Sequence, residues 1–176
     1  MRRVRYSVAM SLDGYIAGPN GESDWILMDP EIDFAAMFRS FDTVLLGRRT
    51  YELTLTQGGG GGVQGMKAVV FSRTLRAADH PGVTLVADDA GGAVAALRAQ
   101  PGRDIWLMGG GVLFRSLLDA GQVDAVEIAL IPVLLGAGIP MLPPPASLAR
   151  LRLTESRTLE KTGTVMLQYA VERGDA

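Results

Sequence analysis

Short apolar runs that alternate with helix-spaced stretches constrain the fold of this chain more than any other feature. The runs are rich in Val, Ile and Leu and are bounded by Gly, Pro or Asp, as strands are. Strands are expected over residues 4–10, 43–47, 67–72, 83–87, 104–109, 124–131, 151–159 and 164–172. Helices are expected over residues 31–40, 48–55, 89–100 and 111–119, where apolar residues recur with helical spacing.

Single helices between successive strands indicate crossover connections, and therefore a largely parallel sheet. Strands that are almost entirely apolar, such as 67–72, indicate a sheet that is covered on both faces. The last two strands are separated only by residues 160–163, too few for a crossover, so they should form an antiparallel hairpin. We therefore predict an α/β fold with an eight-stranded, mostly parallel sheet, a C-terminal antiparallel hairpin and helices on both faces.

The chain is expected to be a single domain over residues 1–176, because a chain of 176 residues is short for two domains. Two long loops, 11–30 and the glycine-rich 57–65, do not mark a boundary, since periodic elements resume on both sides of each. A loop as long as 11–30 is usually functional or mobile.

Charge and residue usage exclude several classes of function. The formal net charge is −2 with no block of like charges, so neither nucleic acid nor an anionic membrane is an expected partner. The chain has no cysteine and one histidine, His80, which excludes thiolate metal sites and histidine-rich ones; no metal is expected. The apolar stretch near the N-terminus breaks at Ser11 and Asp13, too early for a signal segment, so a cytoplasmic location is expected.

Three consecutive glycines, Gly109, Gly110 and Gly111, stand where a strand should meet the N-terminus of a helix. Free backbone N–H groups and the helix dipole bind phosphate at such a place, and glycine lets the phosphate approach closely. A close-packed turn explains the same residues equally well. Phe114 replaces the last glycine of a GxGxxG pattern and the strand is the fifth of the chain, which argues against a Rossmann site.

Two further strand ends carry residues suited to phosphate. One reads Gly47, Arg48, Arg49, Thr50, and the other ends in Ser72 and Arg73. Glycine allows close approach, threonine and serine offer hydroxyl groups, and arginine binds phosphate with two parallel hydrogen bonds. Each alone could be an ordinary polar turn. Together they favour a cofactor with several phosphates, because ligands of open α/β sheets bind along the carboxyl ends of the strands.

Few residues are available for acid–base or nucleophilic catalysis. His80 lies in a turn-like stretch away from any strand-end serine, which argues against a Ser-His-Asp site. A reductase needs less from its protein, because the cofactor supplies the hydride. One of Asp29, Glu31 and Asp33 could donate a proton, although acidic residues there also complement a helix N-terminus.

The order of motifs along the chain resembles the dihydrofolate reductase superfamily. The stretches that carry the resemblance are SVAMSLDGYIAG (7–18), LLGRRTYE (45–52), VVFSR (69–73), LMGGG (107–111) and IPVLLGAGIPML (131–142). They are most similar to the branch that contains the RibD C-terminal domain, the reductase of riboflavin biosynthesis, and its small stand-alone relatives. The resemblance covers nearly the whole chain and implies an NADPH-dependent reductase.

In this family the first strand and the loop after it wall the nicotinamide, and the strand ends bind the phosphates. The resemblance therefore implies cofactor contacts for Ala9, Ile16, Gly47, Arg48, Arg49, Thr50, Phe71, Ser72, Arg73, Met108, Gly109, Gly110, Gly111, Val112 and Leu113. Arg73 and its neighbours would flank the adenosine 2′-phosphate, the group that distinguishes NADP from NAD.

The resemblance also bears on substrate and assembly. Asp33 is the nearest counterpart of the first-helix carboxylate of dihydrofolate reductases, with Glu31 second, and Met10 and Trp25 would line a cleft beside the first helix. The segment 53–66 holds no Arg or Lys that could bind the folate glutamate, so we expect a small heterocycle such as the aminopyrimidine of riboflavin synthesis. Dihydrofolate reduction and a nucleotide- or flavin-binding module without turnover are the alternatives. A homodimer is expected; Val165, Leu167 and Tyr169 suit either its surface or the core.

Overall fold

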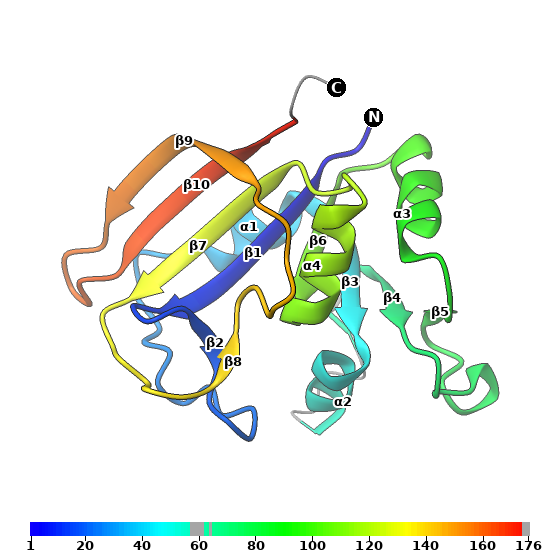
Figure 1. The fold of residues 1–176 in the computed structure, drawn as a ribbon, viewed down its shortest axis with the longest axis horizontal. Coiled ribbons are helices and arrows are strands. Elements are labelled where there is room, and N and C mark those ends of the chain that lie inside the picture. The colour runs from blue at the N-terminus through cyan, green and yellow to red at the C-terminus, as the bar shows by residue number, and fades with distance from the viewer. Residues whose placement is uncertain (57–61, 64, 174–176) are drawn as a thin grey trace.

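A twisted sheet forms the centre of the computed structural model, which describes residues 1–56, 62–63 and 65–173 (Figure 1). Its strands run in the order β5-β4-β3-β6-β1-β7-β10-β9. Their bounds are β1 Val4–Ser11, β3 Phe41–Gly47, β4 Lys67–Phe71, β5 Thr84–Val86, β6 Asp104–Gly109, β7 Ala125–Ile131, β9 Arg150–Thr158 and β10 Val165–Glu172. The helices are α1 Phe34–Arg39, α2 Arg48–Thr56, α3 Ala90–Ala99 and α4 Gly111–Asp119, with a 3-10 turn η1 at Ala77–Asp79.

The pairing of the strands confirms the predicted fold class. The pairs among β5, β4, β3, β6, β1 and β7 are all parallel. Strand β10 is antiparallel to both β7 and β9, so the last two strands form the expected hairpin at one edge of the sheet. The fold is therefore an eight-stranded, mostly parallel α/β sheet of the dihydrofolate-reductase-like type.

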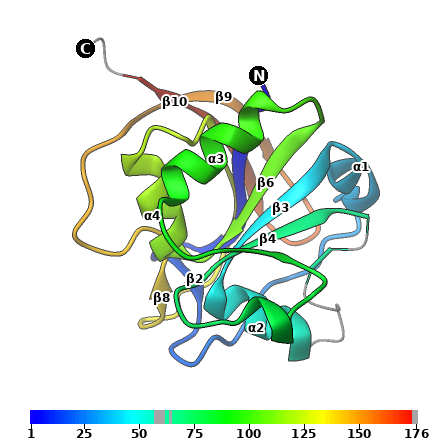
Figure 2. The same cartoon turned by 90° about the vertical axis from the view of Figure 1, so that its right-hand side faces the viewer.

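Apolar cores pack against both faces of the sheet. Helices α3 and α4 lie on one face and α1 lies on the other, as Figure 2 shows. On the α3/α4 face, Tyr6 of β1 stacks on Phe114 of α4 with ring centroids 3.9 Å apart, and both side chains are buried. On the opposite face, Trp106 of β6 packs between Phe38 and Phe41. The alternation of strand side chains produces these two cores.

A small second sheet lies beside the end of β1. It pairs β2 (Tyr15–Ala17) with β8 (Ile139–Pro140), so part of the long loop 11–30 is ordered against a segment far along the chain. A Cβ on Gly138 would lie 2.3 Å from the carbonyl oxygen of Ala17, so only glycine allows this approach. Strands of two or three residues have no measurable periodicity, and the sequence analysis missed both.

The first helix is shorter than the expected 31–40. It begins after Asp33, whose side chain accepts a hydrogen bond from the backbone N–H of Ala36 at 2.8 Å. Such a cap ends the irregular segment and starts the helix at the next residue. Residues 57–61 and 64 of the predicted glycine-rich loop lie outside the described residues. No helix in the described part of the chain has the length and apolar character needed to cross a membrane.

Candidate cofactor site

The three strand ends that the sequence analysis singled out are neighbours in the sheet. Gly47 at the end of β3 pairs with Phe71 at the end of β4. On its other side, Leu46 of β3 pairs with Gly109 at the end of β6. The strands are parallel, so all three carboxyl ends open on the same edge, where open α/β sheets bind their ligands.

Backbone atoms and one hydroxyl group lie close together at this edge, in a cluster that we call the glycine cradle (Gly47, Thr50, Gly109 and Gly110). A Cβ on Gly47 would lie 3.5 Å from both the carbonyl oxygen of Gly109 and the nitrogen of Gly110. A Cβ on Gly110 would lie 3.5 Å from Oγ1 of Thr50. The Gly109–Gly110 peptide bond is cis, and Gly109 has φ +134°, a conformation that favours glycine.

The N-terminus of α4 opens from the same cradle. Its N-cap residue is Gly110, and no side chain of the described residues caps the helix. The first backbone N–H groups of a helix have no partner within it and carry the positive end of its dipole. The amides of Gly111, Val112 and Leu113 are therefore suited to a phosphate.

Gly111 has a different role from its two neighbours. A Cβ at this position would lie 2.6 Å from the carbonyl oxygen of Pro140 and 2.8 Å from that of Met141. Its missing side chain therefore lets the segment 140–143 pack directly against α4. The close-packed turn therefore explains Gly111, whereas Gly109 and Gly110 border the cradle and stay predicted phosphate contacts.

Two arginines near the cradle are free of ion pairs. The guanidinium of Arg48 is 3.1 Å from the carboxylate of Glu52, one turn along α2. Among the described residues, neither Arg49 nor Arg73 forms an ion pair, and both are exposed. Buried Ser72 accepts hydrogen bonds from the backbone N–H groups of Thr74 and Leu75, so it shapes the turn that presents Arg73.

The other predicted cofactor and substrate residues fall on different sides of the sheet. Ala9 is half-buried on the α1 face, whereas Met10 packs against the α3/α4 core. Successive strand residues point to opposite faces, so the assignment of Met10 to a cleft beside α1 is corrected. Phe71 packs against the α3/α4 core and Met108 against the core on the α1 face.

Trp25 and Ile16 belong to the segment after β1. Ile16 is half-buried in β2, and Trp25 is half-buried in the following loop. The indole N–H of Trp25 donates to the carbonyl oxygen of Glu22 at 3.1 Å, so its ring is oriented by its own loop.

Two of the three acidic residues before α1, Asp29 and Asp33, form hydrogen bonds that hold the structure around them. Asp33 is exposed and caps α1, and Glu31 is exposed. Asp29 is only 2% exposed and accepts hydrogen bonds from the N–H of Glu31 at 2.8 Å and the hydroxyl of Thr162 at 2.7 Å. It thereby ties the loop before α1 to the turn between β9 and β10. No cluster of three or more metal-ligating side chains occurs among the described residues.

Asp13 joins two segments that the sequence analysis treated separately. Its carboxylate accepts hydrogen bonds from the hydroxyl of Ser11 at 2.6 Å and from the N–H groups of Leu135 and Gly136 at 3.1 and 2.7 Å. The Ser11 hydroxyl and then these backbone groups lower the pKa of Asp13. The Asp-Gly turn signal was visible in the sequence, but its partner 122 residues away was not.

Replacing Asp29 by Asn is expected to destabilise the fold at neutral pH and to have no effect in acid. The N–H of Glu31 chiefly lowers the pKa of Asp29, and Thr162 and the charge of Lys161 add to this against the effect of burial. A lowered folded-state pKa stabilises the protein above the unfolded value of about 3.9, and this stabilisation is lost as the pH falls through the folded value. Urea unfolding of both proteins from pH 7 to pH 2 would measure the difference.

Asp24 is the matched control, because it is exposed in the same loop. Asp24→Asn should leave the free energy of unfolding unchanged at every pH. A difference between Asp29→Asn and the wild type that persists at the acidic limit would contradict the role of the carboxylate charge.

Fold and site together define a dihydrofolate-reductase-like domain with a glycine-rich cluster at the carboxyl edge of its sheet. Residues 2–165 match the family described as RibD C-terminal domain, and the chain belongs to this family. The uncharacterized protein YyaP of Bacillus subtilis is 32% identical over 179 residues, covering 96% of this chain and 94% of YyaP.

Two solved structures extend the comparison. A Shewanella sp. PV-4 protein assigned provisionally to riboflavin biosynthesis superposes with a TM-score of 0.82 at 25% identity, covering 98% of this chain and 100% of that chain. Dihydrofolate reductase from Enterococcus faecalis, in complex with NADP(H) and RAB-propyl, has a TM-score of 0.71 at 16% identity and covers 97% of each chain. The family match and the Shewanella structure place the chain among RibD-like proteins, and the Enterococcus structure shows that it shares the dihydrofolate reductase fold.

Proposed function

We propose that the protein is an NADPH-dependent reductase that transfers hydride to a small heterocyclic substrate. The observation that carries this proposal is the adjacency of the glycine cradle and the N-terminus of α4, together with two nearby exposed arginines, Arg49 and Arg73, that form no ion pair with a described residue. That arrangement suits a pyrophosphate next to a second, separate phosphate. NADP(H) is bound by the Enterococcus enzyme, whose fold this chain shares.

Each part of the cofactor has candidate partners in the chain. The amides of Gly111–Leu113 would hold the pyrophosphate, and Arg49 and Arg73 would bind the 2′-phosphate. Ala9 has a small side chain and would leave space for the nicotinamide. The bound cofactor supplies the hydride, and one proton, from water or from Asp33, completes the reduction of a double bond.

The substrate that we propose is a pyrimidine like 5-amino-6-(5-phosphoribosylamino)uracil. The family is named after the riboflavin-pathway protein RibD, and the segment 53–66 holds no Arg or Lys to bind a folate glutamate. We propose a cytoplasmic homodimer. Leu167 and Tyr169 of β10 pack against the core, so they are not available for the dimer surface. That surface would instead centre on β9, where Leu151 and Leu153 are 39% and 50% exposed.

NADPH is expected to raise the melting temperature, and NADPH absorbance should fall when an aminopyrimidine is added. A ligand at a hundred times its dissociation constant stabilises the folded state by about 2.7 kcal/mol. No thermal shift at millimolar NADPH would contradict the proposal. A shift without hydride consumption on any pyrimidine or pteridine would instead favour the binding module, and turnover of dihydrofolate would favour a folate reductase.

A further inference from the structure

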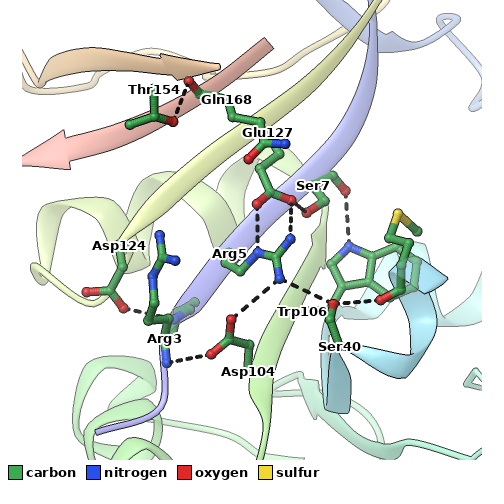
Figure 3. A network of polar contacts seen from close by, with 12 residues as sticks. Arg3, Arg5, Ser7, Ser40, Asp104, Trp106, Asp124, Glu127, Thr154 and Gln168 are labelled. Carbon is green, nitrogen blue, oxygen red and sulfur yellow. Dashed lines mark hydrogen bonds and ion pairs between the residues drawn. The ribbon is translucent and has the colours of Figure 1, made fainter. Parts of the chain in front are cut away.

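A network of charged and polar side chains lies on the α1 face of the sheet (Figure 3). Glu127 of β7 accepts hydrogen bonds from Nε and Nη2 of Arg5 at 2.6 and 3.1 Å and from the hydroxyl of Ser7 at 2.5 Å. Arg5 also reaches Asp104 at 3.4 Å and Ser40 at 3.2 Å. The carboxylate of Glu127 is thus held in one orientation.

The strand register places this network in a wider patch, which we call the open floor (Ser7, Ala9, Glu127, Ala129, Met166 and Gln168). Ser7 pairs with Glu127, which pairs with Gln168. One pleat further, Ala9 pairs with Ala129, which pairs with Met166. Residues two apart on a strand share a face, so all of these side chains point to the same side.

The open floor differs from the rest of the sheet in its burial. Strands β1, β7 and β10 are internal strands, and their residues on the opposite face pack in the α3/α4 core. Within the described part of the chain, no floor residue belongs to either apolar core, and each is partly buried rather than fully buried. Internal strands of a mainly parallel sheet are normally covered on both faces, so incomplete burial of this floor makes it a candidate surface for a ligand.

The floor adjoins the glycine cradle. Tyr6 of β1 pairs with Leu107 of β6, and Ala9 and Gly110 each follow three residues later along these parallel strands. The two alanines therefore lie level with the cradle, and the polar row of Ser7, Glu127 and Gln168 lies one pleat behind them. A ring seated on the alanines would have its far edge at Glu127.

The charges of the network determine which chemical groups at the edge of a ligand ring can bind there. Glu127 accepts hydrogen bonds only, its side chain is 15% exposed, and Arg5 and Ser7 leave about one of its four acceptor positions free. Burial would lower the pKa of Arg5, but Glu127 and then Asp104 raise it overall, so the guanidinium stays charged. With two carboxylates around one guanidinium, the network is net negative and disfavours a phosphate or carboxylate.

We propose that the open floor binds the planar ring of the substrate, with Glu127 accepting a hydrogen bond from an amino or imino N–H at the edge of the ring. Ser7 and Gln168 flank this contact, and any anionic tail of the substrate points away from the network. Glu127 therefore determines specificity for N–H-rich heterocycles, a role that Asp33 cannot share while it caps α1. The role of the bound ring as a substrate rests on the proposed reductase function. The binding of the ring to the open floor does not.

Calorimetric titration of the NADPH-loaded protein with 2,4-diaminopyrimidine and with orotate tests the proposal. Both are pyrimidines, and they present an amino edge and a carboxylate respectively. We expect diaminopyrimidine to bind at least tenfold more tightly than orotate. Glu127→Gln should reduce diaminopyrimidine affinity at least tenfold, and Ala129→Val, which fills the floor without touching the network, should also reduce it.

Glu155→Gln is the matched control, because it removes a carboxylate from β9 at the position that pairs with Gln168, and its affinity should match the wild type. Circular dichroism confirms that each variant is folded. Any of three results would overturn the proposal. Glu127→Gln and Ala129→Val could bind diaminopyrimidine as tightly as the wild type, orotate could bind more tightly than diaminopyrimidine, or only Asp33→Asn could lose diaminopyrimidine binding. Thermal shifts with NADPH are measured separately. If NADPH does not bind, the proposed reductase function is contradicted, and titration of the cofactor-free protein with the two pyrimidines then tests ligand binding at the open floor.

Discussion

Replacing Gly111 by Ala is expected to destabilise the protein by about 1–3 kcal/mol, because overpacking a close contact costs this much. The new Cβ would lie 2.6 Å from the carbonyl oxygen of Pro140 and 2.8 Å from that of Met141, and backbone atoms cannot turn away as a flexible side chain can. Either α4 or the segment 140–143 must move. Urea unfolding measures the loss, and the NADPH thermal shift should shrink as the N-terminus of α4 is displaced.

Gly82→Ala is the matched control, since a Cβ at Gly82 would meet no atom within 4 Å. We expect this variant to unfold like the wild type. If the two alanine variants had the same stability, the close packing of Gly111 against the segment 140–143 could not be the reason for the glycine.

The double replacement of Arg49 and Arg73 by Gln is expected to weaken NADPH binding by at least about a hundredfold and to leave NADH binding nearly unchanged. A hydrogen bond to a charged group contributes about 1.5–3 kcal/mol, and 1.4 kcal/mol is a factor of ten in affinity. Only NADPH carries the 2′-phosphate that these two arginines would bind. Fluorescence titrations with both dinucleotides measure the ratio of affinities.

Arg48→Gln provides the comparison, because the guanidinium of Arg48 is already engaged by Glu52 on the surface of α2. It should lower NADPH affinity much less than the double replacement. Equal losses for NADPH and NADH in the double variant would contradict the assignment of Arg49 and Arg73 to the 2′-phosphate.

The main sheet was predictable because its signals are local. Most of its strands are apolar runs with clear boundaries, and the short 160–163 connection defines the hairpin that includes the polar strand β9. The β2–β8 pair was not predictable, since strands of two and three residues owe their existence to contacts across the chain. The first helix was predicted too long because the apolar spacing over 31–40 outweighed the capping signal of Asp33.

The site was predictable in its parts and not in its arrangement. Glycine, hydroxyl and arginine residues at three strand ends were visible, but only the order β4-β3-β6 makes those ends adjacent. The contact between Ser7 and Glu127 depends on the register of strands 120 residues apart, which no local pattern encodes. Met10 was assigned to the substrate cleft together with its neighbours in the 7–18 motif. Neighbouring strand residues point to opposite faces of the sheet, so Met10 lies on the other face from Ala9.

The packing of the segment 140–143 against Gly111 limits how this protein can be divided. Every residue that we assign to the cofactor lies before Asp119, so a fragment ending there would look like a self-sufficient nucleotide-binding module. Such a fragment would lack β7, which pairs with β1, and the backbone that covers the start of α4. Exchanging the C-terminal third between relatives would therefore replace residues that pack against the cofactor-binding segment and stabilise it. The unit that can be inherited or transplanted is the whole domain.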